Sequence, residues 1–159
     1  MCDPYLSPAD TPITAECRGI DLCSTLTLLT APYGLGCDYR YGCLWISTAA
    51  DTNDWHDPTG VADITPPTQS LLAHVWNEPV AIEGVENSLA EVLEYLETRL
   101  GIRIDVSRLK TSDKGTDFPV TISLQGLPFR HTLGQLLYKT KCRCELEGDT
   151  LVISPPATN

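Results

Sequence analysis

Two stretches of this chain repeat one pattern of apolar and polar positions without a gap: Pro12 aligns with Pro119, and Ser47 aligns with Ser154. In each stretch, alternating apolar residues predict a strand, and a glycine follows where the backbone must turn a corner. Apolar residues at helical spacing come next, and two apolar segments around a short turn predict a hairpin. The repeat therefore predicts two copies of one β-α-β-β unit.

The apolar positions of each copy define the face that its helix and strands turn inward. Asp21 is placed to cap the first helix, whereas Pro128 stands at the matching position of the second copy. The hairpin turns fall at 40–42 and at 147–149. The expected inward residues are Ile13, Ala15, Cys17, Leu22, Leu26 and Leu29 in the first copy, and Val120, Ile122, Leu124, Phe129, Leu133, Leu136 and Leu137 in the second.

A further strand, helix and strand precede the second copy. Val80, Ile82 and Val85 indicate the strand, Ser88–Glu91 forms a capping box, and Gly101 ends the helix. The helix has one apolar stripe, the next strand alternates, and 108–118 is expected to be a loop. From 79 to 156 the predicted order is therefore β-α-β-β-α-β-β.

We expect an α+β chain in which a related βαββ half-repeat precedes a complete unit. The predicted parts are a lead-in at 1–11, the half-unit at 12–48, a loop and short linker helix at 49–77, the complete unit at 78–156 and a tail at 157–159. One helix on one small sheet buries little surface. We therefore expect 12–48 to need either the helix near 68–76 or a partner to pack against.

The linker at 49–77 is rich in turn-forming residues. Asp54, His56 and Asp57 surround Trp55. Such a cluster can be a metal-binding or acid–base group, but we favour the interpretation that these side chains solvate and cap the loop. Thr68 is the expected N-cap of a short helix that runs to about Trp76.

The net charge of −10 restricts the choice of partners. The first 77 residues hold only Arg18 and Arg40 against nine acidic residues. Because phosphate backbones and anionic lipids repel such a surface, we expect no nucleic-acid partner. No apolar run approaches the ~20 residues of a membrane span, so we expect no direct membrane insertion. Met1–Pro4 has neither a basic start nor an apolar core, so we also expect no signal peptide in this sequence.

Seven cysteines leave at least one outside any intramolecular pairing. Cys17, Cys37, Cys142 and Cys144 occupy inward positions, where cysteine acts as a small apolar residue. A disulfide in the first half is the alternative, although Cys37 and Cys43 do not face each other across their hairpin. No CxxC spacing occurs and no histidine completes a ligand set, so we predict neither a metal site nor a cofactor.

Five segments of the complete unit carry a pattern known from a protein family: NSLAEVL at 87–93, TRLGI at 98–102, VTISLQG at 120–126, TLGQLL at 132–137 and LVIS at 151–154. With them, 79–156 resembles the short N-terminal (STN) domain of secretins and TonB-dependent receptors, and 12–48 resembles its second half. The resemblance implies a sandwich with two helices between two small sheets. It also implies a non-enzymatic role and a periplasmic or cell-envelope location. Pro128 departs from the family pattern, which prefers a capping serine or threonine there.

We expect a module for protein–protein interaction, assembly or signalling, whose partner is another protein or a second copy. Open strand edges can accept such a partner's strand. A small-molecule or glycan binder is the alternative, with Trp45, Trp55, Trp76, Tyr39 and Tyr41 as a stacking surface. A hydrolytic enzyme is the third interpretation. His56, His74 and His131 form no recognisable catalytic motif, so no catalytic residue is assigned, and the partner-binding residues stay unknown.

Overall fold

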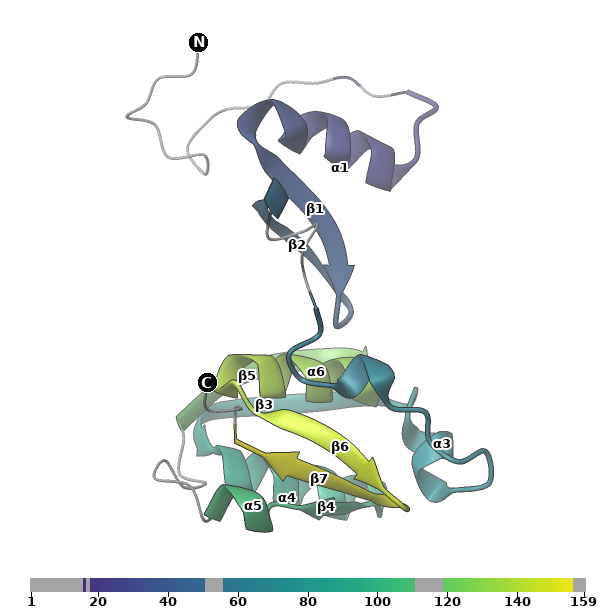
Figure 1. Ribbon diagram of the computed structural model, residues 1–159, viewed down its shortest axis with the longest axis vertical. Coiled ribbons are helices and arrows are strands. Elements are labelled where there is room, and N and C mark those ends of the chain that lie inside the picture. The colour runs from purple at the N-terminus through teal and green to yellow at the C-terminus, as the bar shows by residue number, and fades with distance from the viewer. Residues whose placement is uncertain (1–15, 17, 51–55, 111–118, 156–159) are drawn as a thin grey trace. The chain divides into compact units, whose positions relative to one another are not determined.

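The computed structural model describes residues 16, 18–50, 56–110 and 119–155. The chain divides into two compact units, Met1–His56 and Asp57–Asn159, called here the N-terminal and the C-terminal unit. Both combine helices with small sheets, so the predicted α+β class is confirmed (Figure 1). The strand predicted around Ile13, Ala15 and Cys17 lies outside the described residues.

The C-terminal unit contains two sheets. In the first, β3 (Pro79–Ser88) pairs antiparallel with β5 (Pro119–Pro128). The second contains β4 (Arg103–Asp105), β7 (Thr150–Ser154) and β6 (Arg143–Glu147). Its central strand, β7, runs parallel to β4 and antiparallel to β6.

Two helices complete this unit, and they share one apolar core with both sheets. α4 (Leu89–Leu100) follows β3 directly, and α6 (Phe129–Thr140) follows β5 directly. The core includes the fully buried Leu96, Phe129 and Ile153. The predicted order β-α-β-β-α-β-β is confirmed, with one addition: the helical turn α5 (Ser107–Lys110) begins inside the predicted loop.

Short-range signals fixed the ends of α4 as expected. The Ser88 hydroxyl accepts a hydrogen bond from the Glu91 amide (3.2 Å), and the Glu91 carboxylate accepts one from the Ser88 amide (2.8 Å). Gly101 ends the helix in the left-handed conformation, with φ of 68°. These reciprocal bonds satisfy backbone groups that the helix itself leaves free.

The segment predicted as a linker belongs largely to the core of the C-terminal unit. Its 3₁₀ turn η3 (Val61–Asp63) and its helix α3 (Leu71–Val75) bury Val61, Leu72, Val75 and Trp76. The helix is shorter than predicted, and Ser70 caps it instead of Thr68, because the Ser70 hydroxyl accepts from the Ala73 amide (3.1 Å). The apolar side of α3 is therefore already used within the C-terminal unit.

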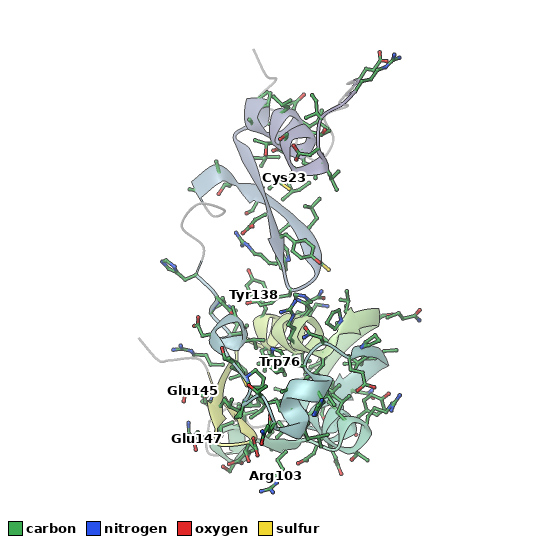
Figure 2. All side chains as sticks on the ribbon, turned by 90° about the vertical axis from the view of Figure 1, so that its right-hand side faces the viewer. Cys23, Trp76, Arg103, Tyr138, Glu145 and Glu147 are labelled. Carbon is green, nitrogen blue, oxygen red and sulfur yellow. The ribbon has the colours of Figure 1, made fainter. Side chains whose placement is uncertain are left out.

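The same segment explains the unusual Pro128. A proline offers no side-chain cap to α6. Instead, the amides of Phe129 and Arg130 donate to the carbonyls of Glu78 (2.9 Å) and Trp76 (3.1 Å). The Trp76 ring packs edge-on against Phe129, with ring centroids 5.7 Å apart (Figure 2). Residues before β3 thus take over the role of the missing capping side chain.

The described part of the N-terminal unit is built around one helix and one hairpin. The described elements are α1 (Leu22–Thr30), the 3₁₀ turn η2 (Ala31–Tyr33), β1 (Leu35–Arg40) and β2 (Cys43–Thr48). As predicted, Asp21 caps α1, and its carboxylate accepts from the Ser24 amide at 2.9 Å. The hairpin register places Cys37 opposite Ile46, so Cys37 and Cys43 are not cross-strand partners.

The two stretches that repeat in sequence follow matching backbone paths where both are described. α1 and α6 begin at aligned residues, Leu22 and Phe129. Cys37 pairs with Ile46 in one hairpin, and the aligned Cys144 pairs with Ile153 in the other. Left-handed φ values recur at aligned positions: Gly19 with Gly126, Gly34 with Lys141, and Tyr41 with Gly148.

The C-terminal unit contains an internal β-α-β repeat, which was not predicted from the sequence. β3 and β5 each have 10 residues, and α4 and α6 each have 12. Pro79 pairs with Pro128 at one end of the ladder and Ser88 with Pro119 at the other, so exchanging the two β-α-β halves preserves the end pairings. The unit therefore has an approximate two-fold axis between β3 and β5.

We predict that Gly60 tolerates substitution less well than Gly101, Gly126 or Gly148. Its φ is +72°, and an added Cβ would lie 2.7 Å from the backbone oxygen of Cys144. Gly60→Ala should lower the free energy of unfolding by about 3 kcal/mol, because left-handed strain adds to a clash with backbone.

Gly148→Ala is the matched control, since Gly148 has φ of +63° with no atom within 4 Å of the added Cβ. It should cost only about 1 kcal/mol. Chemical denaturation of both variants measures the difference, and equal losses would contradict the close approach at Gly60.

Candidate functional site

The histidines do not assemble a catalytic or metal-binding group in the described part of the chain. His56 and His74 are exposed, the latter on α3, and His131 on α6 is half-buried. Burial, followed by the neighbouring Arg130, lowers the pKa of His131. Among described residues no three side chains of histidine, cysteine, aspartate or glutamate are grouped to hold a metal ion.

Asp57 has a structural role. Its carboxylate accepts from the Thr59 amide (2.9 Å), the Thr59 hydroxyl (2.6 Å) and the Ala62 amide (2.7 Å). These bonds hold the turn that leads into η3, as the capping interpretation predicted for this residue. Asp54 and Trp55 lie outside the described residues.

The five described cysteines are free thiols, and two of them are core residues. Cys142 and Cys144 are each 2% exposed, as their inward positions predicted. Burial, and to a smaller extent Glu145, raises the pKa of the Cys144 thiol to about 12, and burial also raises the pKa of Cys142. Neither thiol has the lowered pKa of a nucleophile at neutral pH.

The proposed aromatic surface is not assembled as predicted. Trp76 is 7% exposed inside the C-terminal core, and Tyr41 is also 7% exposed. Trp45 is half-buried, and its indole nitrogen donates to the carbonyl of Arg40 (3.2 Å). Of the described members, only Tyr39 is broadly exposed, so stacking on a shared aromatic face has little support.

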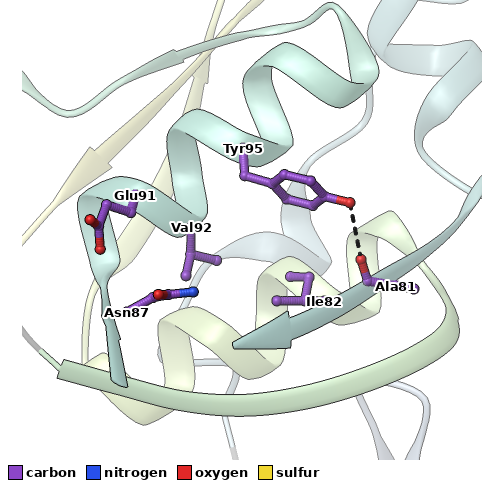
Figure 3. Close-up of a pocket in the computed structure, with 6 residues that line it drawn as sticks. All are labelled: Ala81, Ile82, Asn87, Glu91, Val92 and Tyr95. Carbon is purple, nitrogen blue, oxygen red and sulfur yellow. Dashed lines mark hydrogen bonds between the residues drawn. The ribbon is translucent and has the colours of Figure 1, made fainter. Parts of the chain in front are cut away.

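A groove of about 390 Å³ lies between α4 and β3 (Figure 3). Ile82, Val92 and Tyr95 supply apolar walls, and the Tyr95 hydroxyl donates to the carbonyl of Ala81 at 3.4 Å. At one end lie Asn87 and Glu91. The Glu91 carboxylate is occupied by the capping box, so the groove offers shape and apolar contact more than reactive groups.

The edges of the C-terminal sheets are blunted by bonds to groups outside the ladders. The Glu97 carboxylate accepts from the Ile104 amide of β4 (3.2 Å), and the Cys144 amide of β6 donates to the Thr59 carbonyl (2.7 Å). The Lys139 ammonium donates to the Thr121 carbonyl of β5 (3.2 Å). Such bonds compete with the addition of a foreign strand, so these edges are poorly suited to the strand pairing that we considered.

The N-terminal unit presents a different surface, because its core positions are exposed. Leu22 is 72% exposed, while its aligned residue Phe129 is completely buried. Leu44 (48%) and Ile46 (53%) align with Leu151 and Ile153, which are both at 0%. Leu26 and Leu29 of α1 are half-buried, whereas their counterparts on α6 are completely buried. We call Leu22, Leu26, Leu29, Leu44 and Ile46 the open face.

The open face follows from the missing half of the unit. In the C-terminal unit, residues from β3, α4 and β4 complete the core around the counterparts of these positions. In the described part of the N-terminal unit, α1, η2, β1 and β2 are followed by helical backbone at 49–50, and no counterpart of the β3-α4-β4 half is present there. Leu22, Leu26 and Leu29 were predicted to be inward, and 12–48 was predicted to need either the helix near 68–76 or a partner to pack against.

Comparison with known proteins supplies no relative to guide assignment. No protein-family model matches the chain, and neither curated proteins nor solved structures give a significant match. Of the helices that the structure describes, none combines the length and apolar character needed to cross a membrane. The open face and the α4–β3 groove are therefore the surfaces on which a function can be argued.

We predict that thiol reagents distinguish the described cysteines by exposure. Cys23, exposed on α1 (Figure 2), should be alkylated by iodoacetamide in the native protein, while Cys142 and Cys144 should react only after unfolding. Peptide mass spectrometry at several times measures each site. Native alkylation of Cys144 as fast as that of Cys23 would contradict its burial.

Proposed function

We propose that this chain is a non-enzymatic protein–protein interaction and assembly module of a bacterial cell-envelope protein, related to the STN domain. The observation that carries the proposal is the open face: at core positions of a folding unit, Leu22, Leu44 and Ile46 are exposed, and Leu26 and Leu29 are only half-buried. An exposed apolar patch of this kind is typical of a surface that another protein covers.

A further feature supports this proposal. The C-terminal unit has the element order β-α-β-β-α-β-β that the apolar pattern predicted for the segment resembling the STN domain, although α5 is added. The envelope location is part of the proposal and rests on the resemblance alone.

The proposal is tested by site-specific photo-crosslinking in the organism from which the chain comes. A photoreactive benzophenone amino acid replaces Ile46 on the open face, or Leu28 as the control. Leu28 is 59% exposed on the same unit but aligns with the polar Gln135, so it lies outside the open face. We expect a discrete protein adduct from position 46 and little from position 28.

Adducts of equal strength at both positions would indicate random collision. No adduct at position 46, with the protein present at its normal level, would remove the support for an interaction module.

A small-molecule ligand is the second candidate, favoured by the α4–β3 groove. Its volume of about 390 Å³ falls within the range of ligand sites, and it combines apolar walls with a few polar groups. Ligands from a thermal-shift screen should lose their effect in Tyr95→Ala, since Tyr95 lines the groove. Tyr39→Ala removes an exposed tyrosine from the N-terminal unit and should leave the shift unchanged; loss in both variants, or in neither, would exclude the groove.

A further inference from the structure

The N-terminal unit corresponds to one half of a structure whose two halves cover each other. Its helix begins at the residue aligned with the start of α6, its hairpin has the register of β6 and β7, and three left-handed positions recur at aligned residues. In the C-terminal unit, this half is covered by the β3-α4-β4 half. The natural complement of the open face is therefore another β-α-β motif with the same pattern of apolar positions.

The approximate two-fold axis of the C-terminal unit shows that such halves fit one another. Aligned positions of the two halves are buried together: Leu93 with Leu133, and Leu96 with Leu136. Ile104 and Cys144, on β4 and β6, are likewise both buried. A contact related by a two-fold axis uses the same patch on each side, so one half-motif serves as the partner of another.

We propose that the open face binds the open face of a second copy of this chain, giving a two-fold symmetric dimer. This inference rests on the proposed function and names its partner. In the described chain, the β3-α4-β4 half is already engaged with β5-α6-β6-β7, and α3 is buried in the same core. A second copy brings a matching half that is equally uncovered.

Charge is compatible with this contact. The five residues of the open face are all leucine or isoleucine, so they bring no charged side chain into the contact. Acidic groups dominate elsewhere in the chain, whose net charge is −10. Repulsion between two copies is screened by salt while apolar burial is not weakened, so association should strengthen as ionic strength rises.

The dimer contact resembles the contact inside the C-terminal unit without duplicating it. A single strand, β7, lies between β4 and β6 in that unit. Two N-terminal units bring two such strands, β2 from each copy, to the symmetry axis. The proposed dimer therefore has one strand more than the β4-β7-β6 sheet. The apolar residues of α1 and β2 still meet across the axis.

Sedimentation analysis of the intact chain over a range of concentrations tests the proposal. A monomer of 17.4 kDa should give way to a species of twice that mass, and more readily at higher salt. Leu22→Glu should weaken dimerisation at least about tenfold, because the lost apolar burial occurs twice in a symmetric contact. Ile46→Glu, placed on β2, should act in the same direction.

Leu28→Glu is the matched control, because it makes the same change on the same helix outside the open face. It should leave the dimer intact, and circular dichroism checks that all three variants remain folded. If a variant fails to fold, the salt and concentration dependence of the unaltered chain still decides. A chain that stays monomeric at every concentration and salt level, or a dimer weakened equally by Leu28→Glu, overturns the proposal.

The crosslinking experiment separates this inference from the proposed function. An adduct at position 46 with the mass of two copies supports both. Adducts with a different protein, together with a monomer in sedimentation, overturn the second-copy partner and leave the interaction module standing. The absence of any adduct at position 46 counts against both.

Discussion

A β-α-β half-motif with one apolar stripe is stable only when a second half covers that stripe. The C-terminal unit satisfies this constraint internally: α4 and α6 follow strands of equal length, and their apolar positions enter one core. Burying a leucine side chain stabilises a fold by about 1.5–3 kcal/mol. The completely buried Leu89, Leu96, Leu133 and Leu136 therefore make the pairing of halves the main source of stability.

Residues outside the two paired halves complete the core of the C-terminal unit and satisfy backbone amides that the halves leave without partners. Residues 57–78 add Val61, Leu72, Val75 and Trp76 to the core, and their carbonyls satisfy amides at the start of α6 and on β6. Pro128 is tolerated at the helix start because Trp76 and Glu78 accept the bonds that a capping side chain would otherwise accept. Gly60 allows the approach to Cys144, since its lack of a Cβ leaves room for the carbonyl oxygen.

Structural features that depend on residues close together in the sequence were predicted, whereas features that depend on tertiary contacts were not. The caps at Asp21 and at Ser88–Glu91 depend on residues three positions apart, so their chemistry is visible in the letters. The capping of α6 by residues 76–78 depends on a tertiary contact that no local pattern records. Coverage of an apolar stripe is equally non-local, so Leu22 and Phe129 look alike in sequence yet differ from 72% to 0% in exposure. The internal repeat was hidden because few identities, such as Pro79-Val80 with Pro119-Val120, survive between its halves.

The two units manage exposed surface in opposite ways, and this contrast carries the functional argument. The C-terminal unit protects its strand edges with Glu97, Lys139 and the Thr59 carbonyl, each of which occupies a backbone group that a foreign strand would need. The N-terminal unit leaves apolar core positions exposed instead. A high negative charge keeps such a chain in solution and opposes unspecific contact at long range. Apolar contact acts only at short range and requires matching shape, so the proposed binding at the open face would select a partner that supplies the missing half.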